Sequence, residues 1–390
     1  MTLIIALLLA PTALLTLSFA VEVFVGLRPL RVATIARAQA ACAVIIVPAH
    51  DEAPILKASL ANLKKAASAH ARILLVADNC TDSTAEIGRK LGVETIERFD
   101  ANRRGKGFAL DFAKDYLKRE PPDVVLIVDA DCRIDDESLD VLIQSCAATG
   151  RPCQATNLQN PSPDASPPVQ LSTFAFFIKN VIRQRALQRL AGRANLLGTG
   201  MALPWPIFAQ AELATGNIVE DLKLGQELAD IGHAPLFVEQ ATVWSEAETE
   251  RNTLSQRNRW EGGFLENAFR VGPSMLGRSL LNRDIRGSWA AINTMIPPFA
   301  LLILLDLVAA TVAAAAIWFT TAGSWPLLLL VGSLIVSLAA LTLAWRAGGH
   351  RFVGAGALWR APLYILWKLP MYLAFVRGGA PKEWLRTRRG

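Results

Sequence analysis

The sequence predicts an α/β fold with a doubly wound, mostly parallel sheet, flanked by apolar helices long enough to cross a membrane. Two observations support this fold class. Between residues 42 and 270, short apolar runs alternate with helical patterns, as in chains that build parallel sheets. Long apolar segments lie near the N-terminus and after residue 290, whereas the middle has the composition of a soluble domain. The 390 residues suffice for one large domain with such additions.

The first apolar segment, Leu3–Leu27, is long enough to span a bilayer, which takes about 20 apolar residues. A signal peptide would carry positive charge before its apolar core, and none follows Met1. The basic residues begin only at Arg28, so the positive-inside rule places the chain after it in the cytoplasm. We therefore expect residues 1–30 to form a transmembrane helix.

Strand and helix patterns then alternate. Unbroken apolar runs suit strands that are buried on both faces of a parallel sheet, and right-handed crossovers connect such strands. We expect strands at Cys42–Pro48, Arg72–Ala77, Glu94–Glu97 and Val124–Val128. We expect helices between them at Ile55–Ala67, Thr84–Leu91 and Phe108–Lys118.

Two acidic residues, Asp129 and Asp131, end the central strand. Side chains two residues apart on an extended strand point the same way, so both carboxylates leave the carboxyl end of the strand towards one spot. Ligands of open α/β sheets bind at that end. The pair suits Mg²⁺ or Mn²⁺ carrying a diphosphate, and the alternative is an ordinary polar loop after a strand.

The formal net charge of +6 does not indicate nucleic-acid binding. Many arginines flank apolar segments, as membrane orientation requires, and no run interleaves aromatic with basic residues. The five cysteines form no zinc-binding spacing, and we expect free thiols in a reducing compartment.

The rest of the chain adds helices and further apolar segments. Leu171–Leu190 predicts an amphipathic helix, which suits either internal packing or a membrane surface. Two further transmembrane helices are expected within residues 289–347, at Ile292–Phe319 and Trp325–Trp345. We expect residues 352–390 to form an interfacial amphipathic helix and a basic cytoplasmic tail, with a fourth span as the alternative.

Five short motifs follow one another in the order PAHDE, DNCTD, GKG, DAD, and ED before Q-x-x-R-W. With these motifs, residues 42–270 resemble membrane-bound glycosyltransferase family 2, the group of cellulose synthases, hyaluronan synthases and ceramide glucosyltransferases. The resemblance implies a cytoplasmic GT-A type domain, a UDP-sugar donor and Mg²⁺ or Mn²⁺. It also implies an integral protein of the inner membrane of a bacterium.

The resemblance also implies roles for individual residues. The metal would lie on Asp131, with Asp129 nearer the ribose, and Asp221 of the Glu220-Asp221 pair would be the general base. Because consecutive helix residues point about 100° apart, only one of that pair is expected to face the acceptor. The further substrate-binding residues would be Pro48, His50, Glu52, Asp78, Lys106, Gly198, Thr199, Gly200, Gln256, Arg259 and Trp260.

We therefore expect an inverting transferase that moves a sugar from a UDP-sugar to a lipid-linked or saccharide acceptor. Such a step serves exopolysaccharide repeat-unit or glycolipid assembly, with polysaccharide assembly proteins as further partners. One alternative is a processive polysaccharide synthase, although three spans make a poor channel. Another is a non-catalytic nucleotide-sugar-binding subunit of an export complex, although the acidic pairs and the arginine of Q-x-x-R-W are all present.

Overall fold

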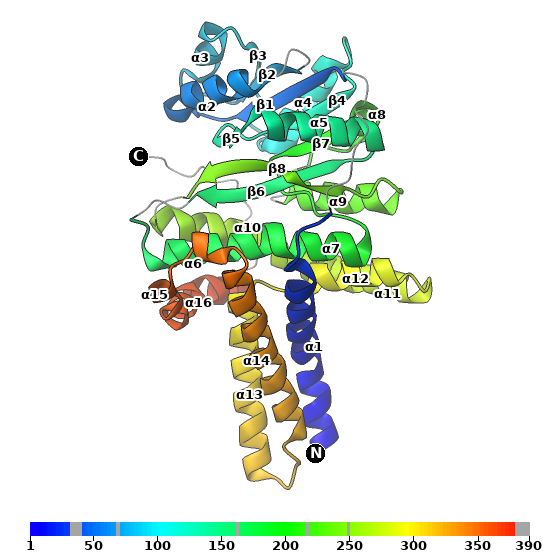
Figure 1. The fold of residues 1–390 in the computed structure, drawn as a ribbon, viewed down its shortest axis with the longest axis vertical. Coiled ribbons are helices and arrows are strands. Elements are labelled where there is room, and N and C mark those ends of the chain that lie inside the picture. The colour runs from blue at the N-terminus through cyan, green and yellow to red at the C-terminus, as the bar shows by residue number, and fades with distance from the viewer. Residues whose placement is uncertain (32–40, 68–70, 161–163, 216–218, 248–249, 379–390) are drawn as a thin grey trace.

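The computed structural model stacks a sheet domain on a belt of helices, and three helices project from that belt as a stalk (Figure 1). It describes residues 1–390 except 32–40, 68–70, 161–163, 216–218, 248–249 and 379–390. The sheet has eight strands in the order β3-β2-β1-β4-β7-β6-β8-β5. This architecture confirms the predicted α/β fold class with flanking apolar helices.

The first half of the sheet is parallel, with β2 pairing with β3 and β1 lying between β2 and β4. Its strands are β1 (Ala43–Ala49), β2 (Ala71–Asp78), β3 (Glu94–Arg98) and β4 (Val124–Ile127). The connecting helices are α2 (Ala53–Ala66), α3 (Thr84–Lys90) and α4 (Lys106–Leu117). Central strand residues such as Ile45 and Leu126 are fully buried because helices cover both faces.

The second half of the sheet is mixed. Strand β7 is antiparallel to both β4 and β6, and β5 is antiparallel to β8, whereas β6 and β8 are parallel. Its strands are β5 (Cys132–Ile134), β6 (Cys153–Asn160), β7 (Met201–Pro204) and β8 (Leu236–Glu246). Helices α5 (Asp136–Thr149), α8 (Trp205–Gln210) and α9 (Glu220–Asp230) lie between them in the chain.

The predicted amphipathic helix is continuous but contains a π-helical turn. It comprises α6 (Pro167–Phe177), the π turn η1 (Ile178–Ile182) and α7 (Arg183–Ala191). Its apolar side chains at Leu171, Phe174, Ile178 and Val181 are buried. They belong to a cluster with residues of the stalk and of the C-terminal helices, so this helix packs inside the protein.

Helices of the belt surround this segment (Figure 1). Together with α6 and α7, the belt comprises α10 (Glu250–Arg270), α11 (Gly272–Leu281), α12 (Ile285–Met295), the 3-10 turn η2 (Gly349–Arg351), α15 (Ala355–Leu358) and α16 (Ala361–Gly378). Helix α16 is tied to α10 by a buried cluster in which Glu261 bonds to both Lys368 and Tyr372. On the outside of this C-terminal segment, by contrast, Trp359 is 87% exposed and Leu363 65%, which leaves an apolar surface uncovered.

Three helices in the described part of the chain are long and apolar enough to cross a membrane. They are α1 (Thr2–Gly26), α13 (Phe299–Phe319) and α14 (Trp325–Arg346). The span expected to begin at Ile292 begins instead at Phe299, which corrects the prediction. Helix α12 ends at Met295, and the prolines Pro297 and Pro298 separate the two helices because proline cannot donate the next helical hydrogen bond.

A buried polar network joins the stalk to the belt. Glu22 of α1 is fully buried and accepts hydrogen bonds from Arg183 Nε at 2.5 Å and Asn293 Nδ2 at 2.7 Å. Arg185 and Arg189 of α7 donate to backbone carbonyls at the end of α1, so cationic side chains also satisfy its last turn. The belt therefore holds α1 by its charged end.

Breaking this network on one side should destabilise the protein. Glu22→Gln or Arg183→Met alone leaves one buried polar partner uncompensated, and the expected loss for a broken buried ion pair is about 3–5 kcal/mol. The double variant should melt above the less stable single variant, because no isolated charge remains. Thermal unfolding of the purified protein measures this, and a native Tm for both single variants would contradict it.

Candidate active site

The acidic loops after β1, β2 and β4 meet at the carboxyl edge of the parallel half of the sheet. Asp78 is the last residue of β2, and Asp129 and Asp131 follow β4. Parallel strands end at the same edge, so residues far apart in the sequence come together there. The central parts of these strands are buried, which gives the edge a rigid base.

At one side of the edge, Asp78 is buried and paired. Its carboxylate accepts from Arg98 Nη1 at 2.6 Å, and its backbone carbonyl lies 2.7 Å from His50 Nδ1. Pro48 of β1 lies beside Val76 of β2, and the backbone N–H of Glu52 donates to Thr84 Oγ1. Four residues expected at the nucleotide are thus neighbours. Sequence reasoning missed Arg98, which directly follows the predicted strand Glu94–Glu97 and is the last residue of β3 at the same edge.

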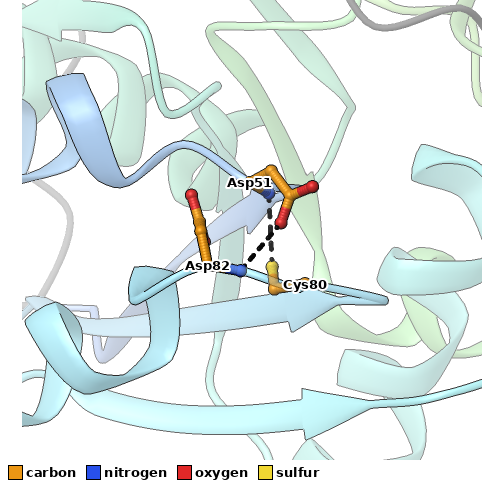
Figure 2. A group of neighbouring side chains, drawn as sticks. All are labelled: Asp51, Cys80 and Asp82. Carbon is orange, nitrogen blue, oxygen red and sulfur yellow. Dashed lines mark hydrogen bonds between the residues drawn. The ribbon is translucent and has the colours of Figure 1, made fainter.

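Figure 2 shows how the loops after β1 and β2 are fastened together. Asp51 has a φ of 53°, and its carboxylate accepts from the backbone N–H of Thr81 at 2.6 Å and of Asp82 at 3.2 Å. The Cys80 thiol accepts from the backbone N–H of Asp51 at 3.4 Å. Burial raises the pKa of Asp51, but these hydrogen bonds outweigh it and lower the pKa overall. The cluster of Asp51, Cys80 and Asp82 is therefore explained by hydrogen bonds that hold the loop after β1 against the loop after β2.

Lys106 lies at the centre of the site. It begins α4, and its ammonium bonds to the Asp129 carboxylate and donates to the Gly198 carbonyl at 2.6 Å. Burial lowers the pKa of Lys106, but the carboxylates of Asp129, Glu220 and Asp221 raise it more. The predicted basic glycine loop thus supplies one cation that stays charged among three acids.

The Gly198-Thr199-Gly200 turn crosses the end of β4. The backbone N–H of Asp129 donates to Thr199 Oγ1 at 3.1 Å, and the N–H of Gly200 donates to the Ile127 carbonyl at 2.9 Å. Gln154 of β6, fully buried, donates to the Thr199 carbonyl and accepts from the N–H of Leu197. Gln154 was not predicted, because a buried glutamine in a strand has no local sequence signal.

The acidic pair opens α9 and faces Lys106. A Cβ on Gly198 would lie 3.1 Å from Asp221 Oδ2 and 3.7 Å from Lys106 Nζ, which shows how closely these groups approach. Burial and the neighbouring Asp221 carboxylate raise the pKa of Glu220 to about 8. Burial also raises the pKa of Asp221, while the Leu222 N–H and Lys106 lower it. Both carboxylates therefore influence the same lysine.

A pocket adjoins this pair. It encloses about 360 Å³ of empty space, part of it open to solvent. Its lining includes Glu220 and Asp221, the backbone region of Leu213 and the start of α4 at Gly107. Glycine is required at Gly107, because a Cβ there would lie 2.3 Å from the Leu213 carbonyl oxygen. The pocket therefore places the acidic pair beside a small hollow that is partly open to solvent.

Asp129, Asp131 and Cys132 bring ligand atoms within 4.8 Å of one another. The two carboxylates suit a hard cation such as Mg²⁺ or Mn²⁺. Burial raises the pKa of the Cys132 thiol well above its usual range, so that this soft ligand stays protonated. The donor set fits a divalent cation held by oxygen.

The Q-x-x-R-W motif falls on α10. The side chains of Gln256 and Arg259 lie outside the described residues, whereas Trp260 is described. The Trp260 ring lies 5.8 Å from the ring of Phe176, and the Arg257 guanidinium lies 5.4 Å from the Trp260 centroid. Arg257, which was not predicted, is buried and donates to Ser172 Oγ at 2.7 Å. Trp260 is thereby fixed against α6.

Residues 40–263 match the family described as glycosyltransferase like family 2, which is more than half of the 390-residue chain. The chain belongs to this family and is a glycosyltransferase. A comparison with curated proteins gives no match.

Two solved structures are among those to which the chain is similar. The mannosyltransferase PcManGT from Pyrobaculum calidifontis, in complex with GDP-Man and Mn²⁺, is 18% identical, with a TM-score of 0.58 over 95% of this chain and 100% of that chain. The glucosyl-3-phosphoglycerate synthase from Mycobacterium tuberculosis, with Mn²⁺, UDP and phosphoglyceric acid, is 14% identical, with a TM-score of 0.38 over 58% and 78%. The first similarity confirms a GT-A fold for this chain.

The contact between Gly198 and Asp221 predicts the effect of one added methyl group. Gly198 has a φ of +84°, so Gly198→Ala both strains the backbone and pushes against Asp221 and Lys106. We expect kcat/KM to fall by about 10²-fold, the usual effect of a small displacement in a catalytic arrangement.

Gly232→Ala is the matched control, because Gly232 has a φ of +89° and a Cβ there would meet nothing within 4 Å. It should lower Tm similarly and leave activity nearly unchanged. Equal activity in the two variants would mean that the approach of Gly198 to Asp221 does not matter for turnover.

Proposed function

We propose that the protein is an inverting, metal-dependent glycosyltransferase that moves a sugar from a UDP-sugar to a lipid-linked acceptor. The observation that carries the proposal is the convergence of Lys106, Asp129, Gly198 and Asp221 at the carboxyl edge of β4. A cation, a metal-binding carboxylate pair and a candidate base meet there beside a pocket. Membership of the family supports the sugar-transfer chemistry.

In this proposal, the uridine lies by His50, Glu52 and Asp78, and Arg98 holds the Asp78 carboxylate in place. Lys106 attracts the negative charge that builds on the departing UDP, because its ammonium stays protonated. The acceptor hydroxyl oxygen bonds to the anomeric carbon while the bond from that carbon to UDP breaks, and Asp221 takes the hydroxyl proton.

The divalent cation would be held by Asp131 and Asp129, whose carboxylates lie together after β4. When bound, such a cation neutralises charge on the diphosphate leaving group. The mannosyltransferase of similar fold has Mn²⁺ in its complex with GDP-Man, which supports the choice of metal.

The acceptor side is proposed to face a membrane. Helices α1, α13 and α14 would form its anchor, with the sheet domain on the cytoplasmic side. The apolar outer surface of the C-terminal segment, with Trp359 and Leu363 exposed, suits a helix that lies in the interface. A lipid-linked acceptor at that surface can reach the site without leaving the bilayer.

Metal dependence follows from the carboxylate pair. Asp131→Asn should abolish transfer and weaken UDP binding in Mn²⁺, since it removes one hard ligand. Transfer assays with EDTA and re-added Mn²⁺, together with titration of UDP binding, measure both effects. Full activity in EDTA or in Asp131→Asn would refute the metal site.

The assignment of the base is tested separately. Asp221→Asn should leave UDP-sugar affinity nearly unchanged and lower kcat by about 10²–10⁴-fold, the usual effect of losing a general base. Glu220→Gln should have less effect. If Asp221→Asn turned over normally while Glu220→Gln were inactive, the two roles would be reversed.

The function as a whole is tested by mass spectrometry of lipid products. Membranes containing the protein are incubated with a panel of UDP-sugars, and with GDP-mannose because one similar enzyme binds it. A single sugar added to a lipid supports the proposal, whereas a long polymer would indicate the processive alternative. Binding of UDP-sugar without any product from active membranes would indicate a non-catalytic protein.

A further inference from the structure

A second pocket lies within the belt of helices, near the point where α1 of the stalk meets it. It contains about 250 Å³ of empty space, part of it open to solvent, and is lined by Lys179, Arg183, Gln184, Asn195, Phe264 and Asn293. These residues come from the π turn, α7, the loop after it, α10 and α12. Two of them, Arg183 and Asn293, are the partners of Glu22 on α1, so the pocket lies where α1 meets the belt.

The polar wall of this pocket is already organised. Gln184 and Asn195 exchange two hydrogen bonds, at 2.8 and 2.9 Å, and Asn195 Nδ2 donates to Asn293 Oδ1 at 3.0 Å. Arg183 is neutralised by Glu22. A ligand would therefore meet a preformed surface and would order few side chains on binding.

Lys179 differs from the paired polar residues of this pocket. Among the residues that the structure describes, it makes no ion pair or hydrogen bond, and its ammonium lies 5.9 Å from the centroid of the Phe264 ring. Its side chain is exposed at the pocket, and the surrounding protein lowers its pKa by partial burial. It sits on a π-helical turn, a feature frequent at functional sites.

The lysine also relates this pocket to the catalytic site. Asp221 is the acid that raises the pKa of Lys179 most, so the two side chains lie within electrostatic range of each other. The pocket thus adjoins the inner end of α1 through Asn293, and its lysine lies within electrostatic range of the candidate base. An acceptor that extends from the bilayer to Asp221 would pass this lysine.

We propose that the second pocket binds the phosphate of the lipid-linked acceptor, with the Lys179 ammonium as its counter-ion. A lysine is a point charge that suits a phosphate oxygen, and no acid lines this pocket among the described residues. The proposal rests on the function proposed above and narrows its acceptor to a lipid phosphate or diphosphate ester, excluding neutral lipids such as ceramide.

The phosphate is a binding group in this proposal and not the nucleophile. A phosphate oxygen is ionised at neutral pH and needs no base to attack the anomeric carbon, whereas a hydroxyl does. The acidic pair beside the first pocket therefore indicates that a hydroxyl reacts. The acceptor that combines both features is a saccharide joined to a polyprenyl diphosphate, with its hydroxyl at Asp221 and its diphosphate at Lys179.

The test compares two acceptors that carry the same saccharide, one on a polyprenyl diphosphate and one on an uncharged alkyl chain. The full-length protein in nanodiscs is assayed as wild type, Lys179→Gln and Lys179→Arg, with Lys118→Gln as the control at an exposed lysine. Lys179→Gln should raise KM for the diphosphate acceptor by about tenfold or more, the usual effect of losing one charged hydrogen bond. Its KM for UDP-sugar and its kcat should change little, and Lys179→Arg should retain most of the affinity.

A binding measurement separates failure of this inference from failure of the proposed function. Native mass spectrometry counts retained polyprenyl diphosphate for each variant without requiring turnover, and inorganic pyrophosphate competes to show whether the lipid chain is needed. Loss of retention in Lys179→Gln alone supports the site even if no sugar is transferred. Equal retention in all variants, or equal KM for the charged and uncharged acceptors, overturns it.

Discussion

The buried carboxylate of Glu22 constrains how the stalk is placed against the belt. A charge in an apolar helix is costly unless partners neutralise it, so α1 is stable only where Arg183 and Asn293 reach it. Those partners belong to α7 and α12, which fixes one stalk helix against two belt helices. The same arginine lines the second pocket, so anchoring and the shape of that pocket depend on one network.

A second buried cluster repeats this design on the other side of the belt. Glu261 bonds to Lys368 and Tyr372 and directly follows Trp260 in α10. Lys368 is only 2% exposed, so its charge holds the C-terminal helix against the helix that carries Q-x-x-R-W. The position of α16 and the orientation of Trp260 are therefore coupled through one carboxylate. The sequence predicted a helix in this segment, but it could not show which helix Lys368 contacts.

The sequence predicted those parts in which local pattern and burial agree. Strands β1, β2 and β4 are apolar along most of their length because both faces are covered, and acids at their ends marked the site. Strand β6 was missed because Gln154 and Asn157 are polar yet buried, and the partners of Gln154 lie in a loop more than 40 residues later in the chain. Arg98 and Glu22 were missed as functional partners for the same reason. Long-range pairing leaves no periodic signal, whereas the resemblance of short motifs did mark both Lys106 and Asp221 as candidate site residues.

The acidic pair gives a physical reason for assigning different roles to its two members. Two adjacent carboxylates in a half-buried site cannot both ionise easily, and their environments separate them. Burial and its neighbour raise the pKa of Glu220 to about 8, so it holds its proton at neutral pH. Burial raises the pKa of Asp221 as well, and Lys106 favours the charged form of both acids, but the Leu222 N–H and Lys179 favour the charged form of Asp221 in addition. Of the two, Asp221 is then the one able to accept a proton, and Glu220, by remaining neutral, avoids adding a second negative charge where the UDP must leave.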